Sequence, residues 1–230
     1  ASDIVSTISV FGSANGCSTT GANIETSTVT IKPTPIVDAV TNITVCSGAN
    51  VPLTVFGSNI SSGGVTFNWT NDNASIGLAT SGTGNIGAFA ATNTGTTPVT
   101  ATITVTPVYG ACAGATDVFT ITVVPTPSVT APSNAAFCNG VNTTAISFTG
   151  TATHYDWTNS DGSIGLATSG TGSIPVFMAA NAGTTPVVAT ITVTPRYTVG
   201  ATNCTGTPQN FTITIQPTPS VVATADQTIC

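Results

Sequence analysis

The sequence predicts an all-β protein made of tandem immunoglobulin-like sandwiches, and three observations lead to this prediction. Thr contributes 49 of the 230 residues, and its branched side chain, like that of Val, suits a pleated strand. Apolar and polar residues alternate in segments such as Phe119–Val123 and Phe211–Ile215, as expected for strands with one buried face. A period of 92 residues runs through the chain, which is about the length of one immunoglobulin-like domain.

Proline-threonine-proline tripeptides mark this period. They occupy Pro33–Pro35, Pro125–Pro127 and Pro217–Pro219 and start 92 residues apart. Between them, Val65–Pro107 aligns without gaps to Thr153–Pro195, with 29 identities in 43 positions. Identity this high indicates one duplicated domain with one structural role.

The period divides the chain into four segments. We expect the C-terminal hairpin of a partial repeat, two complete repeats, and the first strand of a further partial repeat, at residues 1–34, 35–126, 127–218 and 219–230. Because Pro fixes φ and resists helix formation, the tripeptides are expected to be stiff links that stack the domains into an elongated rod. A lone hairpin is marginal in water, so the partial repeats predict either a longer repeat chain or completion by neighbouring molecules through strand addition.

Each complete repeat is expected to hold seven strands, A to G. In the first repeat these are Ile36–Val45, Val51–Phe56, Val65–Thr70, Ser75–Thr80, Ile86–Thr92, Val99–Thr106 and Val118–Val124. A buried Trp on strand C is typical of such sandwiches, and Trp69 and Trp157 occupy that place. The expected core adds inward-facing residues of strands F and G, namely Ile103, Ile191, Phe119 and Phe211.

Several motifs of the repeat resemble those of a known family. They are CSGAN at Cys46–Asn50, FNWTN and YDWTN around the two Trp residues, SGTGNI at Ser81–Ile86, ATITVTP at Ala101–Pro107 and NCTGTP at Asn203–Pro208. Across essentially the whole chain, this series is similar to the PKD-like, immunoglobulin-like repeats of very large bacterial surface proteins exported by type IX secretion. The resemblance implies an extracellular, elongated protein that acts as an adhesin or forms filaments, and it implies no catalytic residues.

Charged residues are scarce. The sequence has 2 Lys and Arg residues, Lys32 and Arg196, against 8 Asp and Glu, and a formal net charge of −6. Binding to nucleic acid requires several cations that neutralise phosphates, so nucleic acids and anionic membrane surfaces are not expected as partners. No run of about 18 apolar residues is present, so no membrane insertion is expected.

Six cysteines in a chain with so little charge indicate an oxidising, extracellular environment. They fall in two classes: Cys17, Cys112 and Cys204 at the tips of F–G hairpins, and Cys46, Cys138 and Cys230 at the ends of A strands. A zinc site is not expected, because the chain has no CxxC motif and a single His.

The two cysteine classes lie at opposite ends of the expected sandwich. A pair such as Cys46–Cys112 would therefore exceed the reach of a disulfide, about 7 Å between Cα atoms. In a head-to-tail rod, the A-strand end of one domain meets the hairpin tip of the next, which predicts the bridge Cys46–Cys204 and leaves four cysteines for partners outside the chain. An alternative satisfies all six internally, by joining Cys17 to Cys46, Cys112 to Cys138 and Cys204 to Cys230.

His154 stands two residues from Asp156, on the same face of strand C. Nucleophilic catalysis needs a nucleophile, a base and a group that orients the base, and the first repeat has Thr66 and Asn68 at the equivalent positions. We therefore interpret His154 as a surface residue. No catalytic residue, no cofactor and no enzyme activity are expected.

Three further patterns have structural interpretations. Asn71, Asp72, Asn73 and Asp161 offer oxygen atoms, but calcium takes six to eight of them, and single acids in turns are typical turn residues. SGTGNI lacks the Lys and the helix of a phosphate loop and is read as a β-turn. Sequons for N-linked glycans occur at Asn42, Asn59, Asn68, Asn73, Asn142, Asn203 and Asn210. For a bacterial source, covalent glycans on exposed Thr or Ser are the expected modification.

These observations predict a structural subunit or segment of an extracellular filament or cell-surface stalk that self-associates into a fibre. The alternative is an adhesin module that binds glycans or surfaces through its end loops. Ordered filaments would favour the first function, and retention of a glycan by monomers would favour the second.

Overall fold

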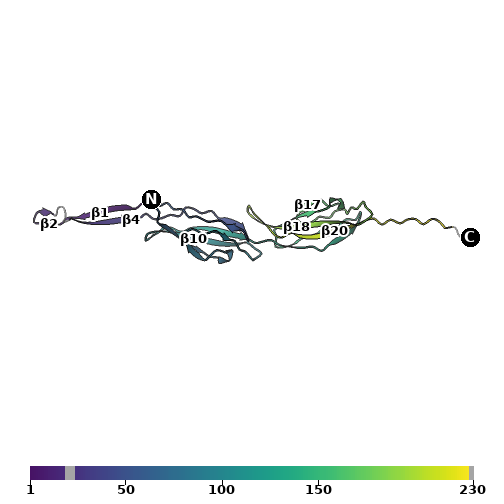
Figure 1. Ribbon diagram of the computed structural model, residues 1–230, viewed down its shortest axis with the longest axis horizontal. Helices are drawn as coiled ribbons and strands as arrows, with labels where there is room; N and C mark the ends of the chain where they lie inside the picture. The colour runs from purple at the N-terminus through teal and green to yellow at the C-terminus, as the bar shows by residue number, and fades with distance from the viewer. Residues whose placement is uncertain (19–23, 228–230) are drawn as a thin grey trace. The chain divides into compact units, whose positions relative to one another are not determined.

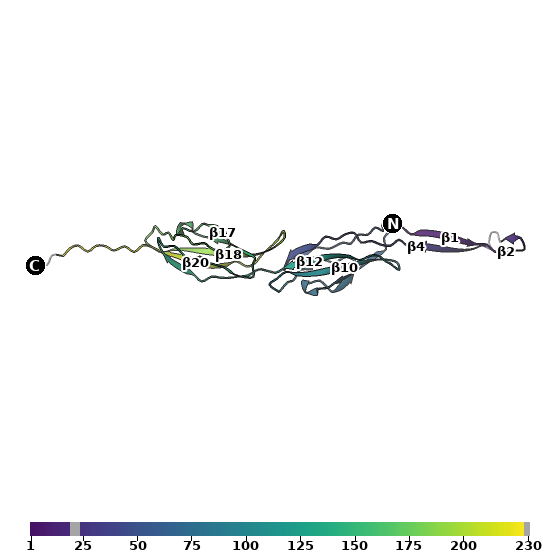
Figure 2. The same ribbon diagram turned by 180° about the vertical axis from the view of Figure 1, so that it is seen from behind.

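The chain folds into two compact units, each of them all-β. The structure is a computed structural model, and it describes residues 1–18 and 24–227. Unit 1 comprises Ala1–Asn93 and Pro98–Val123, and unit 2 comprises Thr94–Thr97 and Val124–Cys230. Figure 1 shows the strands of both units, and Figure 2 shows them from behind. The finer division into four segments stays a prediction.

The described residues of unit 1 form strands and one short 3-10 helix. In chain order these are β1 (Ile4–Val10), β2 (Ser13–Ala14), β3 (Cys17–Ser18), β4 (Glu25–Ile31), β5 (Ile43–Cys46), β6 (Asn50–Val51), β7 (Val65–Asn71), η2 (Ala74–Ile76), β8 (Ser81–Thr83), β9 (Phe89–Ala90), β10 (Val99–Tyr109), β11 (Cys112–Ala113) and β12 (Asp117–Val124). Strands β5, β12, β10, β7 and β8 form one sheet in that order, with β11 paired to β10. Strands β6 and β9 pair in a second, smaller layer, which two isolated bridges extend, Val37 to Ser58 and Thr54 to Ile86.

The core of unit 1 lies between these layers. Along β10, residues Ala101–Val105 alternate between fully buried apolar side chains and partly exposed Thr side chains. Strand β12 repeats the pattern over Phe119–Val123. On the outer face, the hydroxyl groups of Thr100 and Thr122 meet at 2.9 Å across the two strands. The large sheet therefore has an apolar inner face and an outer face of threonine hydroxyls.

Strands β1 and β4 form a separate antiparallel hairpin within unit 1, and Figures 1 and 2 both show them side by side. Ile4 stands opposite Ile31 at its base, in the register that β10 and β12 also use. At its tip, Asn15 and Gly16 have positive φ values of 50° and 82°, as the primed turn of a tight hairpin requires. Both strands are exposed along their whole length. Positions that are buried in β10 and β12 thus lie open in this hairpin.

Unit 2 repeats the sandwich arrangement. Its elements are β13 (Val129–Thr130), β14 (Ala135–Cys138), β15 (Thr149–Gly150), β16 (His154–Asn159), η3 (Gly162–Ile164), β17 (Ser169–Thr171), β18 (Val187–Val199), β19 (Thr202–Thr205) and β20 (Gln209–Gln216). The large sheet has the order β14, β20, β18, β16, β17, with β19 paired to β18, and β13 pairs with β15. Strand β14 runs parallel to β20. Isolated bridges join Asn142 to Met178 and Ile146 to Ile174.

Each unit is centred on one Trp. The six residues expected in the core are all buried, Trp69, Ile103 and Phe119 in unit 1 and Trp157, Ile191 and Phe211 in unit 2. The indole of Trp157 covers Gly170, its cross-strand partner on β17, so closely that a Cβ on Gly170 would lie 2.2 Å from Trp157 Cζ2. Trp69 covers Gly82 in the same way in unit 1. The Trp on the C strand thus dictates a Gly on the neighbouring edge strand.

The predicted strand D at Ser75–Thr80 is wrong, because the chain forms the helix η2 there. Asn73 caps this helix by accepting a hydrogen bond from the backbone N–H of Ser75 at 3.1 Å, and Gly77 ends it with φ of 92°. Asp161 caps η3 in the same way in unit 2. A side-chain cap and a left-handed Gly four residues apart leave room for a single helical turn.

Strands A, B and E are shorter than predicted. The A strand begins at Ile43 rather than at Ile36, and the E strand is reduced to Phe89–Ala90. The B strand ends at Val51, because Pro52 has no N–H to donate to a ladder.

The motif SGTGNI is not a β-turn throughout. Ser81–Thr83 form β8, the edge strand that pairs with β7. The turn begins at Gly84, whose φ is 73°. The second residue of the motif, Gly82, lies under the Trp69 ring. A glycine is needed at this position because the ring leaves no room for a side chain.

Buried amides hold the turn between β16 and β17. Asn159 Nδ2 donates to Leu166 O at 3.1 Å, and Asn159 Oδ1 accepts from Asp161 N at 3.1 Å. Elsewhere in unit 2, Asn181 Nδ2 donates to Ile215 O at 2.8 Å. These side chains replace strand partners for buried backbone groups.

Each full repeat begins where a proline carbonyl lies against a glycine of the F–G hairpin. In unit 2, Gly206 N donates to Pro195 O at 3.0 Å, and a Cβ on Gly206 would lie 1.8 Å from Pro127 O. In unit 1, a Cβ on Gly114 would lie 1.9 Å from Pro35 O. The hairpin and the start of its own repeat are therefore in close contact in both units.

Candidate functional site: the polar cluster of unit 2

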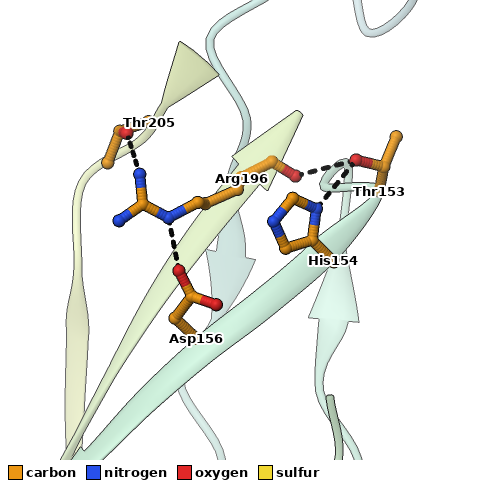
Figure 3. Close-up of polar contacts among 5 residues, drawn as sticks. All are labelled: Thr153, His154, Asp156, Arg196 and Thr205. Atoms are coloured by element: carbon orange, nitrogen blue, oxygen red, sulfur yellow. Dashed lines mark hydrogen bonds and ion pairs between the residues drawn. The ribbon is translucent and has the colours of Figure 1, made fainter. Parts of the chain in front are cut away.

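Unit 2 carries a cluster of polar side chains where β16, β18 and β19 lie side by side (Figure 3). Arg196 on β18 stands opposite His154 on β16 and opposite Thr205 on β19. Its guanidinium donates from Nε to Asp156 Oδ2, and from Nη1 to Thr205 Oγ1 at 2.7 Å. One cation therefore joins three neighbouring strands.

Thr153 closes the cluster on the side of His154. Its backbone N–H and its hydroxyl both donate to Arg196 O, at 2.8 and 3.2 Å, and the hydroxyl accepts from Thr198 N at 3.1 Å. The imidazole lies against the same hydroxyl, with Nδ1 3.3 Å from Thr153 Oγ1. The hydroxyl group thus mainly satisfies backbone groups at the strand end.

The arrangement pairs charges and does not align a nucleophile with a base. An imidazole acts as a general base when a carboxylate orients it, but the carboxylate of Asp156 is bonded to Arg196. The two charged side chains remain 32% and 36% exposed, and an ion pair at such a position contributes about 0–1 kcal/mol to stability. The chemistry that these groups offer is recognition of polar groups or strand clamping.

The cluster is specific to unit 2. Unit 1 has Thr66, Asn68 and Val108 at the positions of His154, Asp156 and Arg196. Sequence reasoning singled out His154 and Asp156 and missed Arg196 as their neighbour. A position-by-position comparison of the two repeats could have identified Arg196 as a neighbour of Asp156. Both positions are neutral in the first repeat, and in the second repeat one carries a carboxylate and the other a guanidinium.

The other cation, Lys32, is also paired. Its Nζ lies 3.1 Å from Asp3 Oδ2 and 4.4 Å from the centroid of the Tyr109 ring. The hydrogen bond from Lys32 holds the pKa of Asp3 below its ordinary value, and the same bond raises the pKa of Lys32. This contact ties the base of the β1–β4 hairpin to the end of β10.

The residues considered as calcium ligands serve turns instead. Asn73 and Asp161 cap the two 3-10 helices, and Asn71 is buried with Nδ2 donating to Leu78 O at 3.0 Å. Asp72 Oδ1 accepts from Thr102 N at 2.7 Å. Across residues 1–18 and 24–227, no three His, Cys, Asp or Glu side chains are grouped to hold a metal ion. Over the same residues, no helix is long and apolar enough to cross a membrane.

Acid should weaken unit 2 through Asp161 and leave the equivalent cap of unit 1 unaffected. Hydrogen bonds from the hydroxyl and the backbone N–H of Ser163 hold the pKa of Asp161 below its ordinary 3.8. A carboxylate with a lowered pKa stabilises the fold above its unfolded pKa, and this contribution is lost as the pH falls through the folded value. Asp161→Asn, which installs the residue found at Asn73, should abolish that part of the acid sensitivity.

The measurement is thermal unfolding of the wild type and of Asp161→Asn between about pH 6 and pH 2, the range in which carboxylates titrate. The difference between the two melting temperatures should be constant above about pH 5 and should change below pH 4. Parallel curves over the whole range would contradict the assignment of Asp161 as an acid-sensitive cap.

The described cysteines differ in their bonding. Cys46 and Cys204 are disulfide-bonded, whereas Cys17, Cys112 and Cys138 carry free thiols. The alternative scheme with Cys17–Cys46 and Cys112–Cys138 bridges is therefore wrong. Cys230 lies outside the described residues. The pairing of Cys46 with Cys204 stays a prediction.

The two cysteine classes lie at opposite ends of a unit. In unit 2, Cys138 stands opposite Gln216 on β20, and Cys204 stands opposite Tyr197 on β18. Ile215 pairs with Val187, so ten residues of β18 separate the two ends, about 33 Å at 3.3 Å a residue. A disulfide between Cys138 and Cys204 is excluded by this distance. We call the end with Cys204 the hairpin end and the end with Cys138 the exit end.

A single tryptic cut tests the predicted bridge. Lys32 precedes Pro33, which blocks trypsin, so the denatured chain is cut only after Arg196. With free thiols alkylated, the two fragments should stay linked until a reductant is added, and Cys46→Ser should release them without reductant. Mass spectrometry reads the result. Separate fragments from the unreduced wild type would show that Cys46 and Cys204 are not partners.

Some sequon asparagines are already used in the fold. Asn42 Oδ1 accepts from Thr120 N at 2.8 Å, and Asn59 Oδ1 accepts from Ile36 N at 2.8 Å. Asn73 caps η2. A glycan on these three nitrogen atoms would have to coexist with local hydrogen bonds that fix the amide.

One family model matches the chain. Residues 43–127 match the family described as PKD-like domain, a range that covers most of the first complete repeat. The second complete repeat shares 29 of 43 aligned residues with the first and has the same sheet order. Both units are thus β-sandwiches with the same sheet order, and the match to the PKD-like family lies in the first complete repeat. No curated protein matches the chain.

Several solved structures share a general likeness with the chain. The extracellular cadherin domains 3–6 of protocadherin gamma B2 have a TM-score of 0.42 and 13% identity, over 95% of this chain and 68% of that one. Mouse cadherin-23 domains EC22–24 have a TM-score of 0.39 and 15% identity, over 81% and 67%. The titin fragment I67–I69 has a TM-score of 0.44 and 9% identity, over 88% and 72%.

Proposed function

We propose that this chain is a structural, non-enzymatic segment of an extracellular filament or cell-surface stalk built from stacked PKD-like domains. The observation that carries the proposal is the polarity of the repeat. A unit has a hairpin-tip cysteine at one end and an A-strand cysteine at the other, and one cysteine of each class is disulfide-bonded. Units with unlike ends join head to tail, and such joints extend into an open filament when the rotation between successive units does not close into a ring.

The polar side chains support a structural role. Thr153 and Arg196 use their hydrogen-bonding groups on neighbouring strands, and Asp161 serves a helix cap. The same sandwich core recurs in both units. Repetition of one domain is typical of proteins that act as spacers, and a single active site does not require it. The proposal therefore includes no catalytic residue and no cofactor.

An extracellular location fits the same observations. Disulfides persist in oxidising compartments, and Cys46 and Cys204 are in this state. The motif series resembles type IX-secreted bacterial surface proteins, so we extend the proposal to secretion by such a bacterium. Covalent glycans on the threonine-rich outer faces would add hydration to a chain with few charges.

Electron microscopy of the native, secreted material tests the proposal. Filaments or stalks with a repeat of one domain length along the axis are the expected result. Purified material should also keep its protease resistance to trypsin, because the chain offers 2 Lys and Arg residues. Isolated globular monomers in the native material would contradict the filament or stalk role.

The second candidate function is an adhesin module, and one observation favours it. The cluster of His154, Asp156 and Arg196 breaks an otherwise close repeat and leaves partly exposed polar groups at the hairpin end. The triple variant His154→Thr, Asp156→Asn and Arg196→Val installs the residues of unit 1 and is a matched control. Binding to a glycan array by the wild type that the triple variant loses would support the adhesin. Equal signals for both would argue against this cluster as the binding site.

A further inference from the structure

We propose that the exit end of unit 2 is a docking surface for a second copy of this chain, which inserts the tip of its β1–β4 hairpin and forms the disulfide Cys138–Cys17. This inference rests on the proposed filament function and names the contact that would join its subunits. The contact combines two free thiols of complementary class with two apolar surfaces.

The thiol chemistry comes from the repeat itself. Cys46 is the unit 1 equivalent of Cys138, and it is disulfide-bonded. Cys204 is the repeat equivalent of Cys17, and it is also disulfide-bonded. Cys138 and Cys17 are exposed free thiols. Each of them therefore occupies a position that forms a disulfide elsewhere in this structure.

The exit end of unit 2 has an apolar patch that unit 1 does not have. Val141 follows Cys138 in a tight turn, and its N–H donates to Cys138 O at 3.3 Å. Residues 177–179 pair with the segment after this turn, since Ala179 N donates to Val141 O at 2.9 Å. Val141, Val176 and Met178 are 50%, 55% and 64% exposed. At the equivalent positions, unit 1 has Ala49, Ala88 and Ala90.

The hairpin tip offers a matching surface. Cys17 follows the Asn15–Gly16 turn directly and stands opposite Ala14. Phe11, just before this turn region, is 61% exposed. No charged residue lies between Phe11 and Ser18 or between Cys138 and Val141, so no ionic group must be desolvated when the two surfaces meet.

Cys17 is a better partner for Cys138 than Cys112 is. Cys112 belongs to the same hairpin-tip class but is half-buried and lies near Lys32. Cys17 projects from a two-stranded hairpin that is exposed along its length. A second copy can therefore present Cys17 without rearrangement of a sandwich.

The covalent step needs an oxidant, and a small-molecule disulfide such as oxidised glutathione supplies it. The Cys138 thiolate attacks this disulfide and releases one glutathione thiolate. The Cys17 thiolate of the second copy then attacks the Cys138 sulfur of the mixed disulfide and releases the second glutathione thiolate. The two protein thiols lose two electrons and two protons, and oxidised glutathione becomes two reduced molecules.

The test uses the full chain with Cys230→Ser, which removes the one cysteine outside the described residues. In a glutathione redox buffer, non-reducing electrophoresis should show a ladder of multiples of 22.7 kDa. Cys138→Ser and Cys17→Ser should each abolish the ladder, and Cys112→Ser should leave it unchanged. An equimolar mixture of Cys138→Ser and Cys17→Ser should give dimers and nothing larger, because each molecule keeps one complementary thiol.

A separate experiment tests the role of the apolar patch. Replacing Val141, Val176 and Met178 with Ala installs the unit 1 residues and should slow dimer formation in that mixture about tenfold, or 1.4 kcal/mol. An unchanged rate would overturn docking through the patch. A ladder that survives Cys17→Ser or Cys138→Ser, or a mixture without dimers, would overturn the proposed pair.

The outcomes separate this inference from the proposed function. Filaments in native material together with no Cys138–Cys17 dimer would overturn the contact and leave the filament role intact. Efficient dimer formation together with globular monomers in native material would support the contact and overturn the filament role.

Discussion

Replacing Trp157 with Ala should lower the free energy of unfolding of unit 2 by about 3–5 kcal/mol. The side chain is 4% exposed and stands between Val193 on β18 and Gly170 on β17. Truncation leaves a cavity above a glycine that has no side chain to fill it, so relaxation of the site is limited. Urea unfolding followed by circular dichroism measures the loss.

The chain supplies its own controls for this experiment. Each unit contains one of the two Trp residues, so the fluorescence of Trp157→Ala reports on unit 1 through Trp69. Trp157→Phe keeps an aromatic ring, and it removes an indole N–H that is buried without a hydrogen-bond partner among the described residues. Its expected loss is smaller than that of Trp157→Ala, because a ring remains over Gly170 and the cavity is smaller. Equal losses for the Ala and Phe variants would show that ring packing is not the source of the stability.

Replacing Gly206 with Ala should destabilise unit 2 by about 3 kcal/mol, the upper end of overpacking penalties. The new Cβ would lie 1.8 Å from Pro127 O and 3.0 Å from Pro195 Cγ. Since the first of these is a backbone atom, either the hairpin or the start of the repeat must move. Thermal unfolding measures the change. The effect should include loss of the bond from Gly206 N to Pro195 O.

Gly87→Ala is the matched control, because nothing lies within 4 Å of its added Cβ and its φ is not in the left-handed region. Its effect should stay within about 0.5 kcal/mol. A Gly206→Ala variant as stable as Gly87→Ala would show that the approach of Pro127 to the hairpin is not tight in solution.

The long strands could be predicted from the sequence because their signal is local. In β10 and β12, Ile, Val and Phe alternate with Thr, and burial follows this alternation residue by residue. The position of Trp69 on the C strand could be predicted for a different reason, because a buried Trp on that strand is typical of immunoglobulin-like sandwiches. Period-two patterns of this strength leave little freedom for another fold.

The short elements could not be predicted from alternation alone. Ser75–Thr80 alternates like a strand, but the cap at Asn73 and the left-handed Gly77 decide its conformation. Both residues are standard signals for the start and end of a helix. Attention to these two residues, rather than to the apolar pattern between them, would have given the right element.

The contacts of the polar cluster could be predicted only in part from individual sequence positions. In the sequence, His154 stands two residues from Asp156 on one strand face, whereas in the structure Asp156 is bonded to Arg196, forty residues away. Cross-strand register makes these residues neighbours, and register follows from pairing rather than from sequence distance. The paired change of Asn68 and Val108 to charged residues in the second repeat is the one sequence signal for the contact.

The threonine hydroxyls on the outer sheet faces set how this surface responds to its surroundings. A hydroxyl carries no formal charge, so its hydration persists at any ionic strength and over the whole range of natural pH. Ionised side chains, in contrast, are screened by salt, and carboxylates lose their charge in acid. A coat of neutral alcohol groups should therefore keep this chain dispersed in fresh water and seawater alike.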